Sequence, residues 1–196
     1  MKRAALAFVT CAFVCPATAT AHVLDQYLQV AQLTLAPDGV GVELRLIPGV
    51  QVADRVFAAI DSNGDGRIAP AEAEAHARAV MHELTLAVDG RRVPLTLVGA
   101  QFPSRSELQD GVGVIRLELA AQVSLMTEGR HRIAMRNDYW PEIGVYLVNV
   151  LVPKSASMTV ARQTRDPLQH ELQLDVDIAR AKRGLWARLR DVLSRI

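Results

Sequence analysis

Hydrophobic and polar residues alternate along two stretches near the start of the chain, residues 24–36 and 40–47. A period of two is typical of a β-strand with one buried face. The tripeptide Pro37–Gly39 separates the stretches and favours a turn, because proline restricts its own φ and glycine accepts a positive φ. The pattern therefore predicts a β-hairpin.

The hydrophobic period changes in the next segment of the chain. In residues 52–60 the apolar side chains recur every three or four positions, which is typical of one face of a helix. Residues 70–83 are rich in Ala and Glu, and they begin with Pro70, a residue suited to the first turn of a helix. The sequence therefore predicts two short helices separated by a loop.

From residue 84 onward the period of two returns. We expect a loop at residues 101–111, and strands at 84–88, 93–98, 112–119, 131–136, 143–152, 158–164 and 171–178. Residues 143–152 are apolar on both faces, which favours a central position in a sheet. The even spacing predicts an α+β, mainly β domain of about eight to nine strands, an antiparallel β-sandwich or a partly open barrel.

The first residues, 1–21, have a different character. Two basic residues precede an apolar run at residues 4–14, and an Ala-x-Ala pattern ends at Ala21. These features indicate a secretory signal peptide, and the run is shorter than the about 20 residues that cross a bilayer. We expect cleavage after Ala21 and a periplasmic or secreted protein. Lipidation at Cys11 or Cys15, and an uncleaved anchor, are the alternatives.

Removal of this segment changes the composition that bears on function. Both cysteines lie in it, so the remaining chain of about 175 residues has neither disulfide nor thiolate chemistry. It also carries two of the 22 basic residues, so the formal net charge falls from +1 to about −1. This balance argues against nucleic-acid binding. The length suits one domain at residues 22–180.

Residues 61–72 read DSNGDGRIAPAE and match the calcium-loop pattern D-x-[DN]-x-[DN]-G-x5-E completely. Calcium prefers six to eight oxygen ligands, several of them from carboxylates. Gly66 permits the sharp turn at position six, Ile68 is the apolar residue at position eight, and Ala69 leaves position nine to a water. The predicted ligands are Asp61, Asn63, Asp65, Arg67 (backbone carbonyl) and Glu72.

The loop with its flanking helices resembles the EF-hand over residues 52–81. This resemblance implies Ca²⁺ as the cofactor of a non-enzymatic protein. Calcium would be a structural clip, or the protein would be a low-affinity responder to external calcium, at about 10⁻⁴–10⁻³ M. Mg²⁺ and a loop that no longer holds a metal are alternatives. Because the sequence has no second such loop, we expect the helices to pack on the β-domain through Val56, Phe57, Ile60, Val80 and Met81.

A wider resemblance covers most of the mature chain. The segments AHVLDQYLQV at 21–30, LIPGV at 46–50 and VYLVNVLVP at 145–153, with the calcium loop, resemble the periplasmic N-terminal region of bacterial membrane proteins related to hydrogenase and urease accessory permeases. We expect no transmembrane part after residue 180, so transport is not implied. The resemblance implies an extracytoplasmic domain that docks on a membrane partner.

Residues 181–196, AKRGLWARLRDVLSRI, predict a basic amphipathic helix. Such a segment suits an anionic membrane surface, a partner helix or a position folded back on the domain, and these alternatives stay open. The expected membrane or partner contacts are Leu185, Trp186, Arg188, Leu189 and Arg190.

An alternative function is periplasmic copper binding. Cleavage after Ala21 makes His22 the N-terminal residue, and its amine and imidazole could chelate copper with a second histidine. The candidates for that second ligand are His76, His82, His131 and His170. The loop at residues 137–142 gathers acidic and aromatic residues, and we expect it to cover one end of the β-domain. No hydrolase, P-loop or dinucleotide motif is present, so we expect no enzyme.

Overall fold

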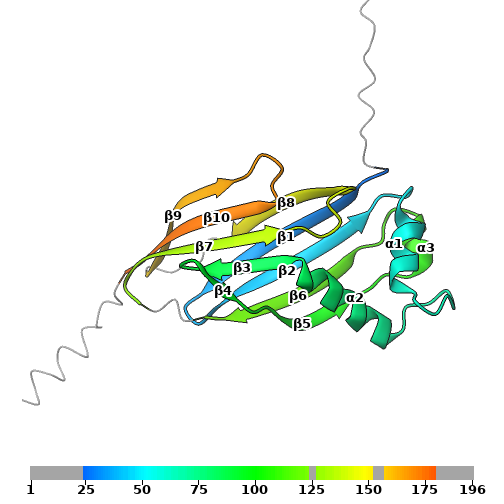
Figure 1. The fold of residues 1–196 in the computed structure, drawn as a ribbon, viewed down its shortest axis with the longest axis horizontal. Helices are drawn as coiled ribbons and strands as arrows, with labels where there is room; N and C mark the ends of the chain where they lie inside the picture. The colour runs from blue at the N-terminus through cyan, green and yellow to red at the C-terminus, as the bar shows by residue number, and fades with distance from the viewer. Residues whose placement is uncertain (1–23, 124–126, 152–156, 180–196) are drawn as a thin grey trace, which may run out of the picture.

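The computed structural model describes residues 24–123, 127–151 and 157–179 of the chain, and this part is mainly β (Figure 1). Strands and helices follow the predicted order, with two short elements more than expected. The elements are β1 Tyr27–Ala36, β2 Gly39–Pro48, α1 Ala53–Ile60, α2 Pro70–His82, β3 Leu84–Val88, β4 Arg91–Val93, β5 Thr96–Gln101, α3 Arg105–Gln109, β6 Ile115–Gln122, β7 Gly129–Asn137, β8 Gly144–Leu151, β9 Met158–Arg165 and β10 Glu171–Ile178.

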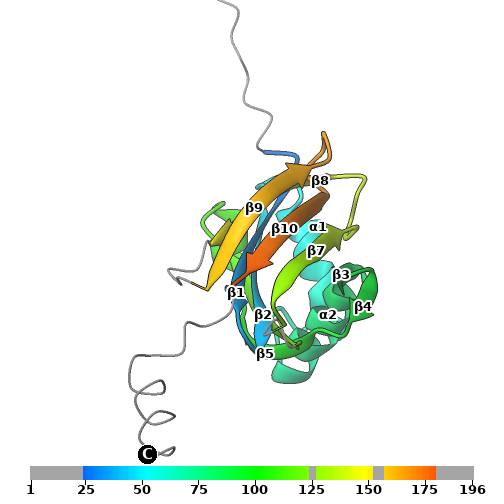
Figure 2. The same ribbon diagram turned by 90° about the vertical axis from the view of Figure 1, so that its left-hand side faces the viewer.

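The strands form two five-stranded sheets that lie one over the other (Figures 1 and 2). One sheet has the order β5-β6-β2-β1-β8, and the other has the order β4-β3-β7-β10-β9. Neighbouring strands are antiparallel except for β1 and β8, which are parallel. Alternate residues of both sheets meet in one hydrophobic core, which is why the strands read as period-two patterns.

The predicted hairpin is confirmed, but the role of its glycine differs from the expectation. β1 and β2 pair from Tyr27 with Pro48 to Ala36 with Gly39. Gly39 does not have a positive φ. A Cβ at this position would instead lie 2.6 Å from the carbonyl oxygen of Ala121 on β6. Close packing of two backbones therefore requires the glycine.

The apolar strand β8 lies at the edge of its sheet, so the prediction of a central strand is wrong. Its outward side chains remain accessible, with Leu147 38% and Leu151 51% exposed. The free edge is partly covered by Arg165 of β9, whose Nε donates to the carbonyl oxygen of Val148 over 2.7 Å. Within the described part of the chain, a side chain of the other sheet thus hydrogen-bonds to this edge.

The region after β3 contains more structure than the sequence predicts. The expected strand at 93–98 is split into β4 and β5, and the expected loop contains the short helix α3. Ser104 and Glu107 form a capping box at the start of α3: Oγ of Ser104 accepts from the Glu107 backbone N–H, and Glu107 Oε2 accepts from the Ser104 N–H over 2.7 Å. This Ser-x-x-Glu spacing was the available sequence signal.

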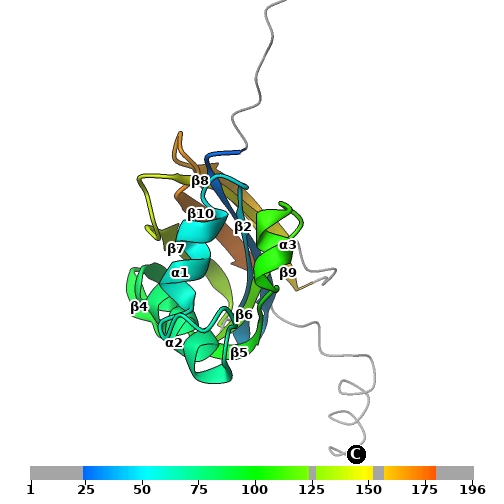
Figure 3. The ribbon, with the colours of Figure 1, turned by 90° about the vertical axis from the view of Figure 1, so that its right-hand side faces the viewer.

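The helices gather at one end of the two sheets (Figure 3). The main core includes Val56 and Ile60 of α1 and Val80 of α2, with Met81 packed against it, as expected. Phe57 differs from the expectation because it packs in a small separate cluster. Its partners there are Ala53, Leu108 of α3 and Ile68.

No helix in the part of the chain that the structure describes is both long and apolar enough to span a bilayer. The predicted signal peptide at residues 1–21 lies outside the described residues. So do His22 and the predicted amphipathic helix at 181–196, including its expected contact residues.

Candidate metal centre

The calcium-loop motif lies between α1 and α2, as the hydrophobic periods predict. Asp61 is the residue that ends α1, and Glu72 lies in the first turn of α2. Pro70 occupies the start of α2, where its missing N–H leaves no helical hydrogen bond unmade. The first and last predicted ligands are therefore attached to two different helices.

The loop is folded around the carboxylate of Asp61. Its Oδ1 accepts from the backbone N–H groups of Gly64 (2.9 Å) and Asp65 (3.2 Å), and its Oδ2 accepts from Gly66 (2.8 Å). Gly64 and Gly66 have φ angles of +71° and +80°, which residues with a side chain rarely adopt. These glycines let the backbone curl so that its N–H groups point at one carboxylate.

Asn63 and Asp65 also direct their oxygens at the loop backbone. Oδ1 of Asn63 accepts from the N–H of Asp65 over 2.8 Å, and Oδ1 of Asp65 accepts from the N–H of Arg67 over 2.9 Å. Nδ2 of Asn63 donates to Oδ2 of Asp65 over 3.2 Å. Both side chains are exposed, so a cation can reach them from solvent.

Glu72 joins the two ends of the loop and is only 8% exposed. Its Oε1 accepts from Ser62 N (2.9 Å), Ser62 Oγ (3.0 Å) and Asn63 N (3.2 Å), and its Oε2 accepts from Ala69 N (2.9 Å). The hydrogen bond from Ala69 is the main reason that the pKa of Glu72 is lowered, and those from Ser62 and Asn63 add to it against desolvation. The carboxylate is therefore charged at neutral pH.

The predicted donors are all oxygen atoms on a single short loop. Three carboxylates and one amide oxygen make a hard donor set, which suits Ca²⁺ or Mg²⁺. Among residues 24–123, 127–151 and 157–179, no three His, Cys, Asp or Glu side chains are grouped closely enough to hold an ion as they stand. Because Oε1 of Glu72 already accepts three hydrogen bonds, ligation by this oxygen requires it to exchange some of these partners for the cation.

Ile68 attaches the loop to the rest of the molecule. It is half-buried and packs against both the main core and the small cluster that contains Phe57. The apolar residue at position eight thus lies against the core. The exposed ligand positions therefore lie in a loop that is attached to packed elements at both of its ends.

The histidines considered as copper ligands lie in separate surroundings. His76 is buried on α2, and burial lowers its pKa to about 4. His82 is exposed, with Nδ1 2.9 Å from Glu83 Oε1. Nδ1 of His131 lies 2.7 Å from Oδ2 of Asp89. The ring of His170 packs against the ring of Tyr146, with their centroids 4.1 Å apart.

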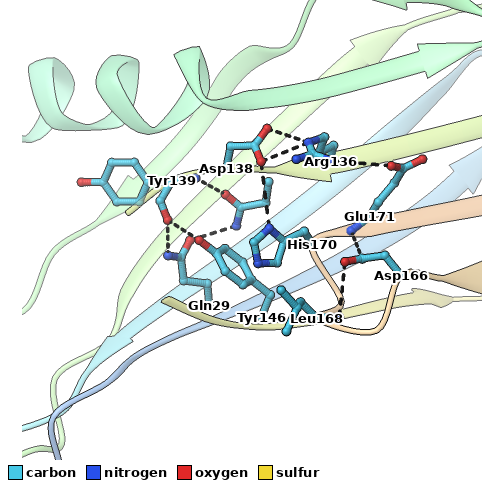
Figure 4. Close-up of polar contacts among 10 residues, drawn as sticks. Gln29, Arg136, Asp138, Tyr139, Tyr146, Asp166, Leu168, His170 and Glu171 are labelled. Atoms are coloured by element: carbon cyan, nitrogen blue, oxygen red, sulfur yellow. Dashed lines mark hydrogen bonds and ion pairs between the residues drawn. The ribbon is translucent and has the colours of Figure 1, made fainter. Parts of the chain in front are cut away.

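A buried polar network near the β7–β8 loop was not found from the sequence (Figure 4). Nε2 of Gln29 donates to the carbonyl oxygen of Tyr139 over 2.6 Å, and Nδ2 of Asn137 donates to Oε1 of Gln29 over 2.9 Å. The Tyr146 hydroxyl donates to the same Tyr139 oxygen over 2.8 Å. Buried polar groups need such partners. The network therefore anchors the loop to β1 and β8.

Charged residues of β7, β10 and the β7–β8 loop lie beside this network (Figure 4). Arg136 Nε lies 2.7 Å from Asp138 Oδ2, and Arg136 Nη1 lies 3.7 Å from Glu171 Oε2. Nδ1 of His170 lies 4.0 Å from Asp138 Oδ1. These pairs are partly exposed, so their effect on stability is small.

Comparison with known proteins assigns no family to the chain. No protein-family model matches it, and no curated protein or solved structure matches it significantly. A metal centre is therefore inferred from residues 61–72 and from α1 and α2, which hold them.

Proposed function

We propose that this protein is an exported, non-enzymatic calcium-binding protein. Residues 52–81 act as an EF-hand inserted into a β-sandwich formed by the two sheets. The observation that carries the proposal is the complete calcium-loop motif at residues 61–72, held between two helices with its side-chain oxygens directed into the loop. The ligands are Asp61, Asn63, Asp65, the carbonyl of Arg67 and both oxygens of Glu72.

Electrostatics supports a cation at this loop. Asp61, Asp65 and Glu72 place three carboxylates within twelve consecutive residues. A bound divalent cation offsets their mutual repulsion and takes the place of hydrogen bonds that the backbone now donates. Ca²⁺ is favoured over Mg²⁺ because it accepts more oxygen ligands in a flexible geometry, whereas Mg²⁺ requires near-octahedral geometry and keeps its waters.

Calcium would act first as a clip between the helices. Its ligands come from the end of α1, the loop and the first turn of α2, so an ion restrains the angle between the two helices. Binding to the folded state alone stabilises that state by mass action, by about 2.7 kcal/mol at a hundred times the dissociation constant. A low-affinity site of this kind also responds to external calcium.

Export and docking follow from the two ends of the chain. Residues 1–21 have the features of a signal peptide, and 181–196 those of a basic amphipathic helix. We infer that the latter segment contacts an anionic membrane surface or a membrane-protein partner. Sedimentation with anionic vesicles tests the first alternative. It should be lost on deleting residues 181–196, and equal sedimentation of the truncated chain would contradict membrane contact by this segment.

Calorimetry with calcium tests the proposed function. We expect saturable one-site binding with a dissociation constant in the range of about 10⁻⁶–10⁻³ M, with weaker competition from Mg²⁺. Glu72→Gln should abolish it, because an amide supplies one ligand oxygen in place of two charged ones. Glu74→Gln is the matched control, since Glu74 is an exposed glutamate on the same helix that pairs with Arg78. Absence of both binding heat and a shift in melting temperature at about 5 mM calcium would exclude this function, because that concentration exceeds the largest dissociation constant expected.

A further inference from the structure

The loop between β7 and β8, residues 138–143, contacts α1 through one arginine. The guanidinium carbon of Arg55 lies 4.9 Å from the centroid of the Trp140 ring. Nη2 of the same side chain lies 2.9 Å from Oε1 of Glu142. A cation–π contact and an ion pair thus join a single side chain of α1 to two residues of this loop.

The same loop contacts α2 through a buried histidine. Nε2 of His76 lies 3.4 Å from the Tyr139 hydroxyl oxygen, and the two rings are nearly perpendicular, with centroids 5.9 Å apart. His76 follows Glu72 by four positions on α2, and both side chains are buried. Residues four apart lie on one face of a helix. The proposed ligand and the loop contact are therefore neighbours on α2.

The two loop residues held by the helices also contact each other. The rings of Tyr139 and Trp140 are stacked, with centroids 5.7 Å apart and planes 20° apart. The Tyr27 ring of β1 packs edge-on against both. Gln29 of β1 and Tyr146 of β8 donate to the Tyr139 carbonyl oxygen. A displacement of the aromatic pair would therefore disturb its hydrogen bonds with both strands.

Trp140 has a conformation that its surroundings must maintain. Its φ is +48°, which is unusual for a bulky residue. Strain of this kind persists only where neighbouring contacts hold it. The described contacts of its ring include the guanidinium of Arg55 and the rings of Tyr139 and Tyr27. The position of α1 therefore contributes to the conformation of the loop.

Ion binding at residues 61–72 would act directly on the junction between α1 and α2. Oε1 of Glu72 accepts three hydrogen bonds and Oε2 accepts one from Ala69, so ligation must replace some of them. Glu72 belongs to α2, and Asp61 lies at the end of α1. Drawing both carboxylates to one ion moves the helices relative to each other, and with them Arg55 and His76.

We propose that calcium occupancy of residues 61–72 sets the conformation of the β7–β8 loop, residues 138–143, through Arg55 on α1 and His76 on α2. This inference rests on the proposed calcium function and extends it. In this arrangement the Tyr139–Trp140 pair changes conformation when the metal site is occupied, and through its contacts the change reaches the two sheets. A ligand can shift such an element only by its different affinity for the two arrangements.

Tryptophan fluorescence of the full chain tests this coupling. The chain has two tryptophans, so Trp186→Phe leaves Trp140 as the sole tryptophan. In this background we expect calcium chloride to change the Trp140 emission saturably, with the midpoint that calorimetry gives for binding. Glu72→Gln should abolish both signals.

Two variants and a matched control separate coupling from binding. Arg55→Met and His76→Leu should each reduce the calcium-dependent emission change while calorimetric binding persists, with the dissociation constant altered by about fivefold or more. Arg105→Met is the control, because Arg105 also pairs with α1, through Asp54 at 3.1 Å and Phe57, but has no described contact with the β7–β8 loop. It should retain the full response.

The outcomes distinguish the inference from the function on which it rests. Calorimetric binding with an unchanged Trp140 emission would overturn the coupling and leave calcium binding intact. A full emission change in both Arg55→Met and His76→Leu would also overturn it. Absence of calorimetric binding in the parent chain would remove the proposed function itself, and the coupling with it.

Discussion

The carboxylate of Glu72 accepts a hydrogen bond of 2.9 Å from the backbone N–H of Ala69, three residues before it. This bond satisfies a donor at the start of α2, where the helix has no partner of its own for it. The same carboxylate is the predicted bidentate ligand at position twelve of the calcium loop. One side chain therefore caps a helix and belongs to the candidate metal centre.

Glu72→Ala should destabilise the calcium-free protein, because the N–H groups of Ser62, Asn63 and Ala69 lose their acceptor. We expect its melting temperature in EDTA to fall by a few degrees. The melting temperature of Glu72→Gln should fall less, since its amide oxygen still accepts hydrogen bonds from these N–H groups. Thermal melting with Glu74→Ala as the control measures this. Equal melting of all three variants and the parent would show that the cap contributes nothing.

The buried His76 should make stability fall in mild acid. Burial lowers its folded pKa to about 4, whereas an unfolded histidine has a pKa near 6.5. Between these values the unfolded state binds a proton that the folded state does not, so the free energy of unfolding drops by about 1.4 kcal/mol per pH unit. Urea denaturation from pH 7 to 5 should show this slope, reduced in His76→Leu. The exposed His82→Leu control should keep it, and a flat parent profile would contradict the prediction.

His131 should act in the opposite direction at higher pH. The hydrogen bond with Asp89, and a second with the Thr127 carbonyl, raise the pKa of His131. Its contribution to stability is complete below the unfolded pKa and is lost as pH rises through the raised folded pKa. Melting temperatures from pH 6 to 9 should decline with a step that His131→Gln removes. A step that survives in this variant would assign the titration to another group.

Two tyrosines offer a matched test of hydrogen bonding in the aromatic cluster. The hydroxyl of Tyr27 is buried and has no hydrogen-bond partner among the described residues, whereas that of Tyr146 donates to the Tyr139 carbonyl oxygen. Tyr27→Phe should leave stability unchanged or raise it by up to about 1 kcal/mol. Tyr146→Phe should lower it by about 1 kcal/mol. Chemical denaturation of both variants decides, and a larger loss in Tyr27→Phe would reveal a partner for its hydroxyl.

The candidate metal centre was predictable because its interactions are local. The hydrogen bonds among Asp61, Asn63, Asp65 and the loop N–H groups join residues two to five apart in the chain. The flanking helices follow from their own hydrophobic period, and the hairpin follows from a short turn. In each case the residues that determine the structure are contiguous in sequence.

Features that depend on residues far apart in the sequence were decided only by the tertiary structure. β8 has the composition of a central strand, yet among the described strands its one sheet neighbour is β1, so it ends the sheet. Gln29 meets the Tyr139 carbonyl across 110 positions, and Arg55 meets Glu142 across 87. Hydrophobic periodicity tells which face of an element is buried, but not which element covers it. The sequence by itself thus determined most of the strands, the two longer helices and the calcium-loop motif. Only the packing of the two sheets brought the β7–β8 loop against α1 and α2.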